Sequence, residues 1–110
     1  MKVAVPVKAN KKAIDKNFGH APFFAILDSD TRKVTFAENP AEHANHDADT
    51  LAARAVIEMG IECLGLVKCS PKILNMLWDA DLEVCETEGA SVNENLESLM
   101  AGTLMEFDED

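Results

Sequence analysis

Four side chains in this sequence are of types that bind transition metals: His20, His43, His46 and Cys69. Imidazole and thiolate groups suit soft or borderline metal ions. His43 and His46 are three residues apart, so both face one ion if their segment turns helically. Cys69 lies just before a predicted helix, whose dipole lowers the pKa of a thiol and favours the metal-binding thiolate. The pattern predicts a site of three histidines and one cysteine, provided that the fold brings them together.

Each of these residues also has a plain structural interpretation. A histidine in a polar loop is often only a polar loop residue, and Cys69 also fits a small buried side chain. Cys63 and Cys85 lie in predicted strands among apolar neighbours, where they act as small hydrophobic residues, so we do not assign them to the site. Three cysteines form neither an even disulfide set nor a CxxC pair. This pattern fits a reducing compartment and predicts a cytoplasmic protein.

The elements that must position these residues follow from the apolar pattern. β-branched and aromatic runs predict strands at residues 2–7, 22–28, 34–37, 61–67 and 82–85. Apolar residues at helical spacing predict one helix over residues 49–59 and two more between and after the last strands. The expected start and stop signals are Asp47 or Asp49 and Gly60 for the first helix, Ser70-Pro71 for the second, and the capping box from Ser91 to Glu94 with Gly102 for the third.

The order of these elements is strand, strand, strand, helix, strand, helix, strand, helix. A hairpin start followed by two strand-helix-strand steps predicts a mixed sheet with helices on its faces. With the second strand antiparallel to the others, the loops at residues 8–21, 38–48, 68–70 and 86–90 meet at one edge, where open α/β sheets bind ligands. The three histidines, Cys69 and the positive ends of all three helices fall at this edge.

The length of the chain indicates one domain, and its charge and hydropathy argue against nucleic acid and membrane as partners. The chain has 110 residues, of which 47% are hydrophobic, enough for one packed core. We expect a single domain over residues 1–105 and an acidic tail over 106–110. A net charge of -10 repels phosphate backbones, so nucleic acid is not expected as a partner. No apolar run is long enough to cross a bilayer, and the start of the chain does not read as a signal peptide.

Three segments together resemble a known family. They are residues 1–7 (MKVAVPV), 18–24 (FGHAPFF) and 38–41 (ENPA), and they are similar to the dinitrogenase iron-molybdenum cofactor biosynthesis family. The resemblance implies a ribonuclease H-like α/β fold of three layers, with a five-stranded mixed sheet of order 3-2-1-4-5 whose second strand is antiparallel. It also implies noncovalent binding of a metal-sulfur cluster of the iron-molybdenum, molybdenum-copper or iron-sulfur type.

The resemblance also suggests the residues around the cluster. Asn17 stands where many relatives have histidine, and His20 where they often have arginine, so a protonated His20 can contact an anionic cluster. The turn that contains Lys68 replaces a Gly-x-x-Gly-like turn, and Lys68 supplies positive charge. The expected cluster-binding residues are Asn17, Gly19, His20, Lys68, Cys69 and Ser70, and the expected metal ligands are His20, His43, His46 and Cys69.

The function predicted from these features is that of a small non-enzymatic binding or carrier protein for a metal-sulfur cluster, with a protein partner in cofactor assembly or metal trafficking. Three alternatives stay open. The histidines and Cys69 also fit a chaperone for single zinc, copper or iron ions. Cys69 with a histidine base fits a thiol-dependent redox protein or enzyme, and the polar edge fits a protein-interaction module. A nuclease is excluded, because the first strand lacks the carboxylates that hold two metal ions.

Overall fold

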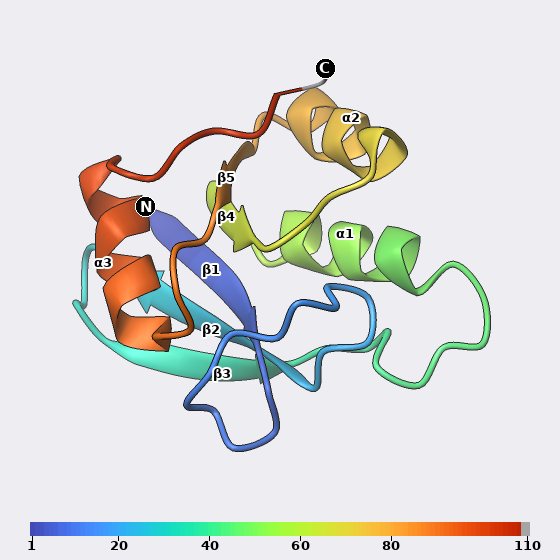
Figure 1. Ribbon diagram of the computed structural model, residues 1–110, viewed down its shortest axis with the longest axis horizontal. Helices are drawn as coiled ribbons and strands as arrows, with labels where there is room; N and C mark the ends of the chain where they lie inside the picture. Colours follow the sequence, from blue (N-terminus) through green and yellow to red (C-terminus); the bar gives the residue numbers. More distant parts are fainter. Residues whose placement is uncertain (109–110) are drawn as a thin grey trace.

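The computed structural model, described for residues 1–108, contains one five-stranded mixed sheet (Figure 1). The sheet order is β3-β2-β1-β4-β5, with β1–β2 and β2–β3 antiparallel and β1–β4 and β4–β5 parallel. The predicted fold class and strand order are therefore confirmed. The elements are β1 (Lys2–Val7), β2 (Phe23–Asp28), β3 (Val34–Glu38), α1 (Ala48–Glu58), β4 (Cys63–Leu66), α2 (Pro71–Asp79), β5 (Glu83–Glu86) and α3 (Val92–Ala101).

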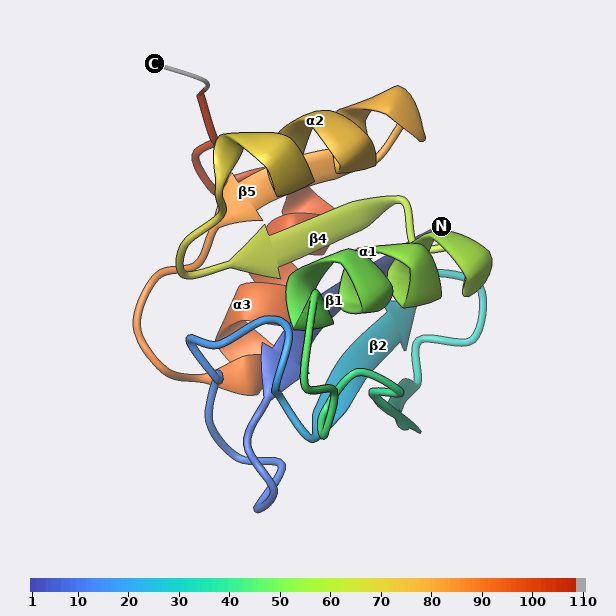
Figure 2. The ribbon, with the colours of Figure 1, turned by 90° about the vertical axis from the view of Figure 1, so that its right-hand side faces the viewer.

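Helices cover both faces of the sheet. Figure 2 shows α1 and α2 on one face and α3 on the other. Alternate residues of β1 serve the two sides: Ala4 belongs to the core shared with α1 and α2, whereas Val3, Val5 and Val7 pack with α3. The central strand is therefore buried on both faces, which explains its continuous apolar run.

Side chains cap two of the helices as the sequence predicts. The Ser70 hydroxyl accepts the backbone N–H of Ile73 at 3.4 Å, and the Ser91 hydroxyl accepts that of Glu94 at 3.2 Å. For α1 the expected N-cap position is confirmed, but the expected side-chain cap is absent. Asp47 does occupy its N-cap position, but with a left-handed φ of 54° and no side-chain capping hydrogen bond. The carboxylates at this helix start are therefore not used as caps.

The end of the packed chain lies beyond the expected boundary at residue 105. Glu106 forms a bridge with Cys85, and the backbone N–H of Phe107 donates to the carbonyl of Val84 at 2.9 Å, so this segment covers the outer edge of β5. The last two residues of the expected acidic tail, Glu109 and Asp110, lie outside the described residues.

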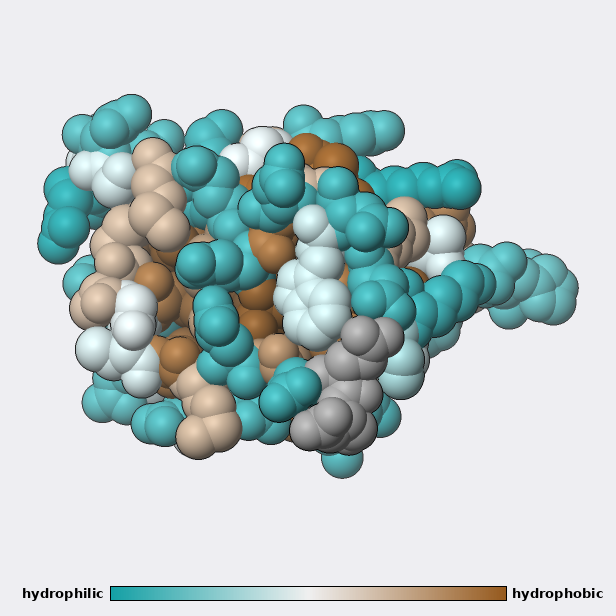
Figure 3. Space-filling model, turned by 90° about the horizontal axis from the view of Figure 1, so that it is seen from above, coloured by the Kyte–Doolittle hydropathy of each residue, from teal (hydrophilic) through white to brown (hydrophobic). Residues whose placement is uncertain are grey.

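On the face that carries α2 and the C-terminal segment, hydrophobic atoms show between hydrophilic side chains (Figure 3). No helix within residues 1–108 has the length and apolar character needed to cross a membrane.

Candidate functional site

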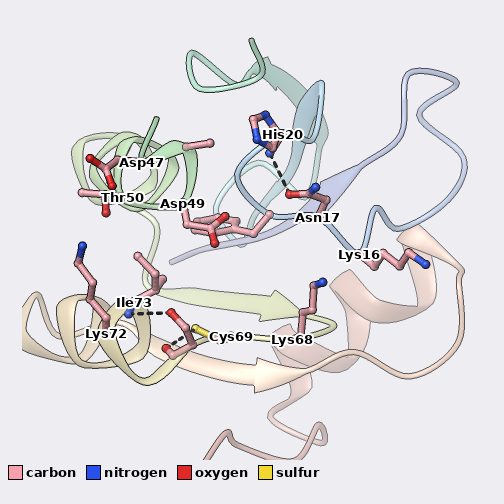
Figure 4. Close-up of a pocket in the computed structure, with 13 residues that line it drawn as sticks. Lys16, Asn17, His20, Asp47, Asp49, Thr50, Lys68, Cys69, Lys72 and Ile73 are labelled. Carbon is pink, nitrogen blue, oxygen red and sulfur yellow. Dashed lines mark hydrogen bonds between the residues drawn. The ribbon is translucent and has the colours of Figure 1, made fainter. Parts of the chain in front are cut away.

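A cavity of about 740 Å³ lies at the carboxyl ends of the parallel strands. Its walls come from the loop before β2, the start of α1 and the turn between β4 and α2 (Figure 4). This is the edge at which the sequence predicts a site, and three of the four expected loops or their flanks reach it. The lining residues are Lys16, Asn17, Phe18, His20, Asp47, Ala48, Asp49, Thr50, Lys68, Cys69, Ser70, Lys72 and Ile73.

Gly19 allows the loop before β2 to pack against the start of α1. A Cβ atom at this position would overlap the Asp49 carboxylate and would lie only 2.7 Å from the Asp49 backbone nitrogen. Next to it, the Asn17 side-chain oxygen accepts the backbone N–H of His20 at 3.3 Å and closes the turn. Gly19 does not itself line the cavity. Its role is to let the loop and the helix form one wall.

A buried asparagine outside the cavity holds the same loop. Asn39 is only 4% exposed, and its amide nitrogen donates to the carbonyls of Phe18, Gly19 and Ala21 at 3.3, 3.1 and 2.9 Å. Its side-chain oxygen accepts the backbone N–H of Ala41 at 3.0 Å. One side chain therefore satisfies backbone groups that could find no strand or helix partner. In the sequence this asparagine stood out only as part of the segment 38–41 (ENPA) that carries the family resemblance.

His20 is exposed at the cavity wall, and its tautomer follows from one contact. Its Nδ1 atom lies 2.9 Å from the carbonyl oxygen of Glu42. A carbonyl can only accept, so Nδ1 carries the proton and Nε2 keeps the free lone pair of the neutral ring. Metal-binding histidines commonly donate their second N–H to a backbone carbonyl in this way. The residue fits either a ligand role when neutral or a donor role when protonated.

The state of Cys69 differs from the expectation. Burial, together with the negative charge of Asp49, raises the pKa of its thiol to about 11. The prediction that the helix dipole favours the thiolate was therefore wrong, because desolvation and a nearby carboxylate outweigh the dipole. The thiol contacts the carbonyl oxygen of Ser70 at 3.6 Å. Cys69 is thus a protonated thiol at neutral pH and must lose its proton to bind a metal.

Positive groups gather around the cavity although the chain is acidic. Lys68 and Lys72 belong to the β4–α2 turn and the first turn of α2, and Lys16 lies on the opposite loop, where its side chain extends away from the other labelled residues (Figure 4). The N-termini of α1 and α2 add the positive ends of their helix dipoles. The carboxylates of Asp47 and Asp49, at the start of α1, carry negative charge that opposes this positive charge. Lysines and helix N-termini together favour an anion on the side of the β4–α2 turn.

The structure brings together some of the predicted site residues and leaves others out. Asn17, His20, Lys68, Cys69 and Ser70 line one cavity, with Gly19 packed behind them. His43 and His46 are exposed and do not line it. The His43 ring instead lies 3.4 Å from the carboxylate of Glu42, with its side chain 89% exposed.

The expected set of three histidines and Cys69 is not assembled. Within residues 1–108, no group of three or more His, Cys, Asp and Glu side chains is placed to hold a metal ion. Eight of the thirteen lining residues were not predicted as site residues, and two of them, Lys72 and Asp49, carry charge that acts on the cavity. Lys72 lies in the first turn of a predicted helix, so its position relative to the proline was a usable signal. Asp49 was considered only as a possible helix cap, and its closeness to Cys69 depends on the tertiary fold.

Comparison with known proteins decides the family. Residues 1–102 match the family model described as dinitrogenase iron-molybdenum cofactor. The chain belongs to this family. No curated protein matches the sequence.

Three solved structures with the same fold superpose well on this chain. The apo form of the orange protein from Desulfovibrio gigas superposes with a TM-score of 0.85 at 24% identity, covering 96% of this chain and 92% of that one. A candidate NifB protein from Thermotoga gives a TM-score of 0.70 at 24% identity over 96% and 91% of the two chains. A candidate dinitrogenase from Methanocaldococcus jannaschii gives 0.72 at 16% identity over 100% and 97%. At these identities the likeness establishes the fold.

Proposed function

We propose that this protein is a small non-enzymatic carrier that binds a metal-sulfur cluster in the cavity between α1, α2 and the loop before β2. The cluster is of the iron-molybdenum, molybdenum-copper or iron-sulfur type and is the cargo of the protein. The carrier works in the cytoplasm with a protein partner in cofactor assembly or metal trafficking. Membership of the dinitrogenase iron-molybdenum cofactor family supports this role.

The observation that carries the proposal is the charge of the cavity. In a chain with a net charge of -10, Lys68, Lys72 and the start of α2 present positive charge to one open space. Thiometallate clusters are anions, and lysine ammonium groups with free backbone N–H groups are the donors that such anions need. Cys69 and His20 add one thiol and one imidazole that can replace a terminal ligand of the cluster.

The two chemical alternatives have weaker support. A single-ion chaperone needs several ligands around one point, and residues 1–108 offer no such group of three. A thiol enzyme needs an activated thiolate. Burial and Asp49 instead raise the pKa of Cys69 to about 11, which makes its sulfur a poor nucleophile at neutral pH.

Anaerobic reconstitution tests the proposal. The protein is incubated with iron and sulfide, or with tetrathiomolybdate and copper, and the bound metal and the visible absorption are measured after desalting. We expect stoichiometric uptake with visible charge-transfer bands, reduced at least tenfold in affinity by Cys69→Ala and by Lys68→Ala. His43→Ala and His46→Ala are matched controls, since both histidines lie in a neighbouring loop but outside the cavity. No uptake, or uptake that none of the cavity variants changes, would contradict the proposed carrier role.

A further inference from the structure

A second cavity of about 340 Å³ lies on the α3 side of the sheet and shares no lining residue with the first. Two of the three cysteines of the chain face it, together with two glutamates. From the sequence, both cysteines were expected to act as small hydrophobic residues, and the proposed carrier role does not use them. The lining residues are Cys63, Glu83, Cys85, Leu99, Gly102, Leu104 and Glu106.

The strand register brings the two thiols together. In the parallel β4–β5 pair, Cys63 lies opposite Glu83 and Gly65 lies opposite Cys85. The cysteines are thus offset by two residues on neighbouring strands, and both side chains point to the α3 face. They are 2% and 6% exposed. Burial raises the pKa of both thiols, and each thiol also acts on the pKa of the other, as expected of two neighbouring sulfurs.

The same register disfavours a disulfide between them. Neighbouring strands lie about 4.8 Å apart, and a two-residue offset adds about 6.6 Å along the strand, so the two Cα atoms are roughly 8 Å apart. Disulfides rarely span Cα atoms more than about 7 Å apart without movement of the backbone. Oxidation therefore requires distortion of the sheet, whereas an ion placed between the two sulfurs spans a wider gap without it.

The charge around the thiols selects a cation. The carboxylates of Glu83 and Glu106 act on both cysteines and raise their pKa values, in addition to the effect of burial. The same negative charge attracts a positive ion and repels an anionic cluster. This second cavity thus has the opposite electrostatic character to the lysine-lined cavity at the other site.

We propose that Cys63 and Cys85 form a second metal site, which binds one Cu(I) ion between two thiolates. Thiolates select soft ions such as Cu(I), and Cu(I) accepts two ligands in a linear arrangement. Zinc needs four ligands, and residues 1–108 provide no group of three or more at this point. When the ion binds, two Cu–S bonds form and the two thiol protons leave to solvent. The ion enters and stays as Cu(I), so no electron is transferred.

The C-terminal segment covers this site. The backbone N–H of Glu86 donates to the carbonyl of Met105 at 2.7 Å, and Phe107 continues the pairing with Val84 at 2.9 Å. Leu104, at the start of this segment, is buried and lines the cavity. The segment pairs with the edge of β5 only along this short stretch, so its displacement opens a route to the thiols at the cost of few hydrogen bonds.

An anaerobic Cu(I) titration tests this inference independently of the carrier role. The protein without cluster is titrated with Cu(I) in competition with the chromophoric chelator bathocuproine disulfonate. We expect one Cu(I) per chain in the unchanged protein and in Cys69→Ala. We expect an affinity lower by more than about 100-fold in Cys63→Ala and in Cys85→Ala, because even outer-shell partners of a metal site are worth roughly 10–100-fold.

X-ray absorption at the copper edge of the unchanged protein needs no variant and covers the case in which a core variant fails to fold. Two sulfur neighbours and no further ligand support the site. Absence of Cu(I) binding, loss of binding only in Cys69→Ala, or a coordination sphere of nitrogen and oxygen would overturn it. Uptake of thiomolybdate in Cys63→Ala and Cys85→Ala should stay unchanged, so a failure of this site is distinguishable from a failure of the carrier proposal.

Discussion

Two buried asparagines play matching roles on opposite sides of the sheet. Asn39 holds the loop before β2, as described above. Asn95 of α3, 1% exposed, accepts the backbone N–H of Glu88 at 2.8 Å and donates to the carbonyls of Glu88 and Ser91 at 3.0 and 2.8 Å. An amide side chain offers both two donors and an acceptor, which no aliphatic or carboxylate side chain of this size does. These two residues fix the loops that flank the carboxyl ends of the parallel strands.

Substitution of Asn39 should destabilise the protein strongly for a single side chain. In Asn39→Ala the carbonyls of Phe18, Gly19 and Ala21 lose their donor, and each buried unpaired group costs about 1–3 kcal/mol. We expect the free energy of unfolding in urea to fall by about 2 kcal/mol or more. Asn10→Ala is the control, since Asn10 is exposed and accepts one N–H from Lys12. Equal losses in the two variants would show that Asn39 does not hold the loop.

The thiol of Cys69 should react slowly at neutral pH and faster as the pH rises. Only the thiolate is alkylated by iodoacetamide. Raising the pKa from 9.0 to about 11 lowers the thiolate fraction at pH 8 by about 100-fold. The alkylation rate, measured by mass spectrometry of the peptide that contains Cys69, should therefore increase with pH up to about 11.

Besides burial, Asp49 should lower the reactivity of this thiol. Asp49→Asn removes the charge that raises the pKa of Cys69, so alkylation at pH 8 should become faster. Asp47→Asn is the matched control: Asp47 also lines the cavity but does not act on the thiol, and asparagine tolerates its left-handed backbone. The interpretation fails if both variants change the rate equally.

At the scale of elements, the start of α2 joins the fold to the site. Ser70 caps this helix and lines the cavity, whereas Ser91 caps α3 in the same way but lies outside the cavity. Ser70→Ala and Ser91→Ala should each lower the free energy of unfolding by about 1 kcal/mol. Only Ser70→Ala should also weaken thiomolybdate binding, because it disturbs the start of α2, which lines the cavity of the proposed cluster. Equal binding in the two variants would contradict a role of the α2 N-terminus.

The elements themselves could be predicted from local sequence. The caps at Ser70 and Ser91 and the strand order follow from short-range patterns and from the rules for parallel connections. Boundaries followed less closely: β4 was expected over residues 61–67 but is Cys63–Leu66, because Ile61 is buried in the core without belonging to the strand, and Val67 is exposed just after it. Apolar character alone does not separate a strand from a buried turn.

The site was less predictable because it depends on tertiary placement. The sequence located the edge at which the cavity lies and several residues that line it, but it could not show that His43 and His46 lie outside the cavity. Nor could it show that Cys69 is partly buried and lies near Asp49, and burial together with this carboxylate reversed the expected direction of the thiol pKa. Local sequence patterns predict a helix and therefore the direction of its dipole. They do not give the burial and the long-range charges that here outweigh it.

At the scale of the whole molecule, an acidic chain that binds an anion must concentrate its few cations. The chain has 10 basic and 20 acidic residues, so its mean field opposes an anionic cluster and binding depends on local lysines. Such local attraction acts between partly exposed charges and is screened over about 8 Å at physiological salt. Thiomolybdate binding should therefore weaken as salt concentration rises, in contrast to binding governed only by metal-sulfur bonds.

Charge reversal separates the local field from the overall charge. Lys68→Glu and Lys33→Glu give chains of identical net charge, but Lys68 lines the cavity and Lys33, in the turn before β3, does not. We expect Lys68→Glu to reduce thiomolybdate affinity by about 10-fold or more, which corresponds to about 1.4 kcal/mol, and Lys33→Glu to have little effect. Equilibrium dialysis at two salt concentrations measures both. Equal losses would mean that the net charge of the chain, rather than the lysines at the cavity, governs recognition of the anion.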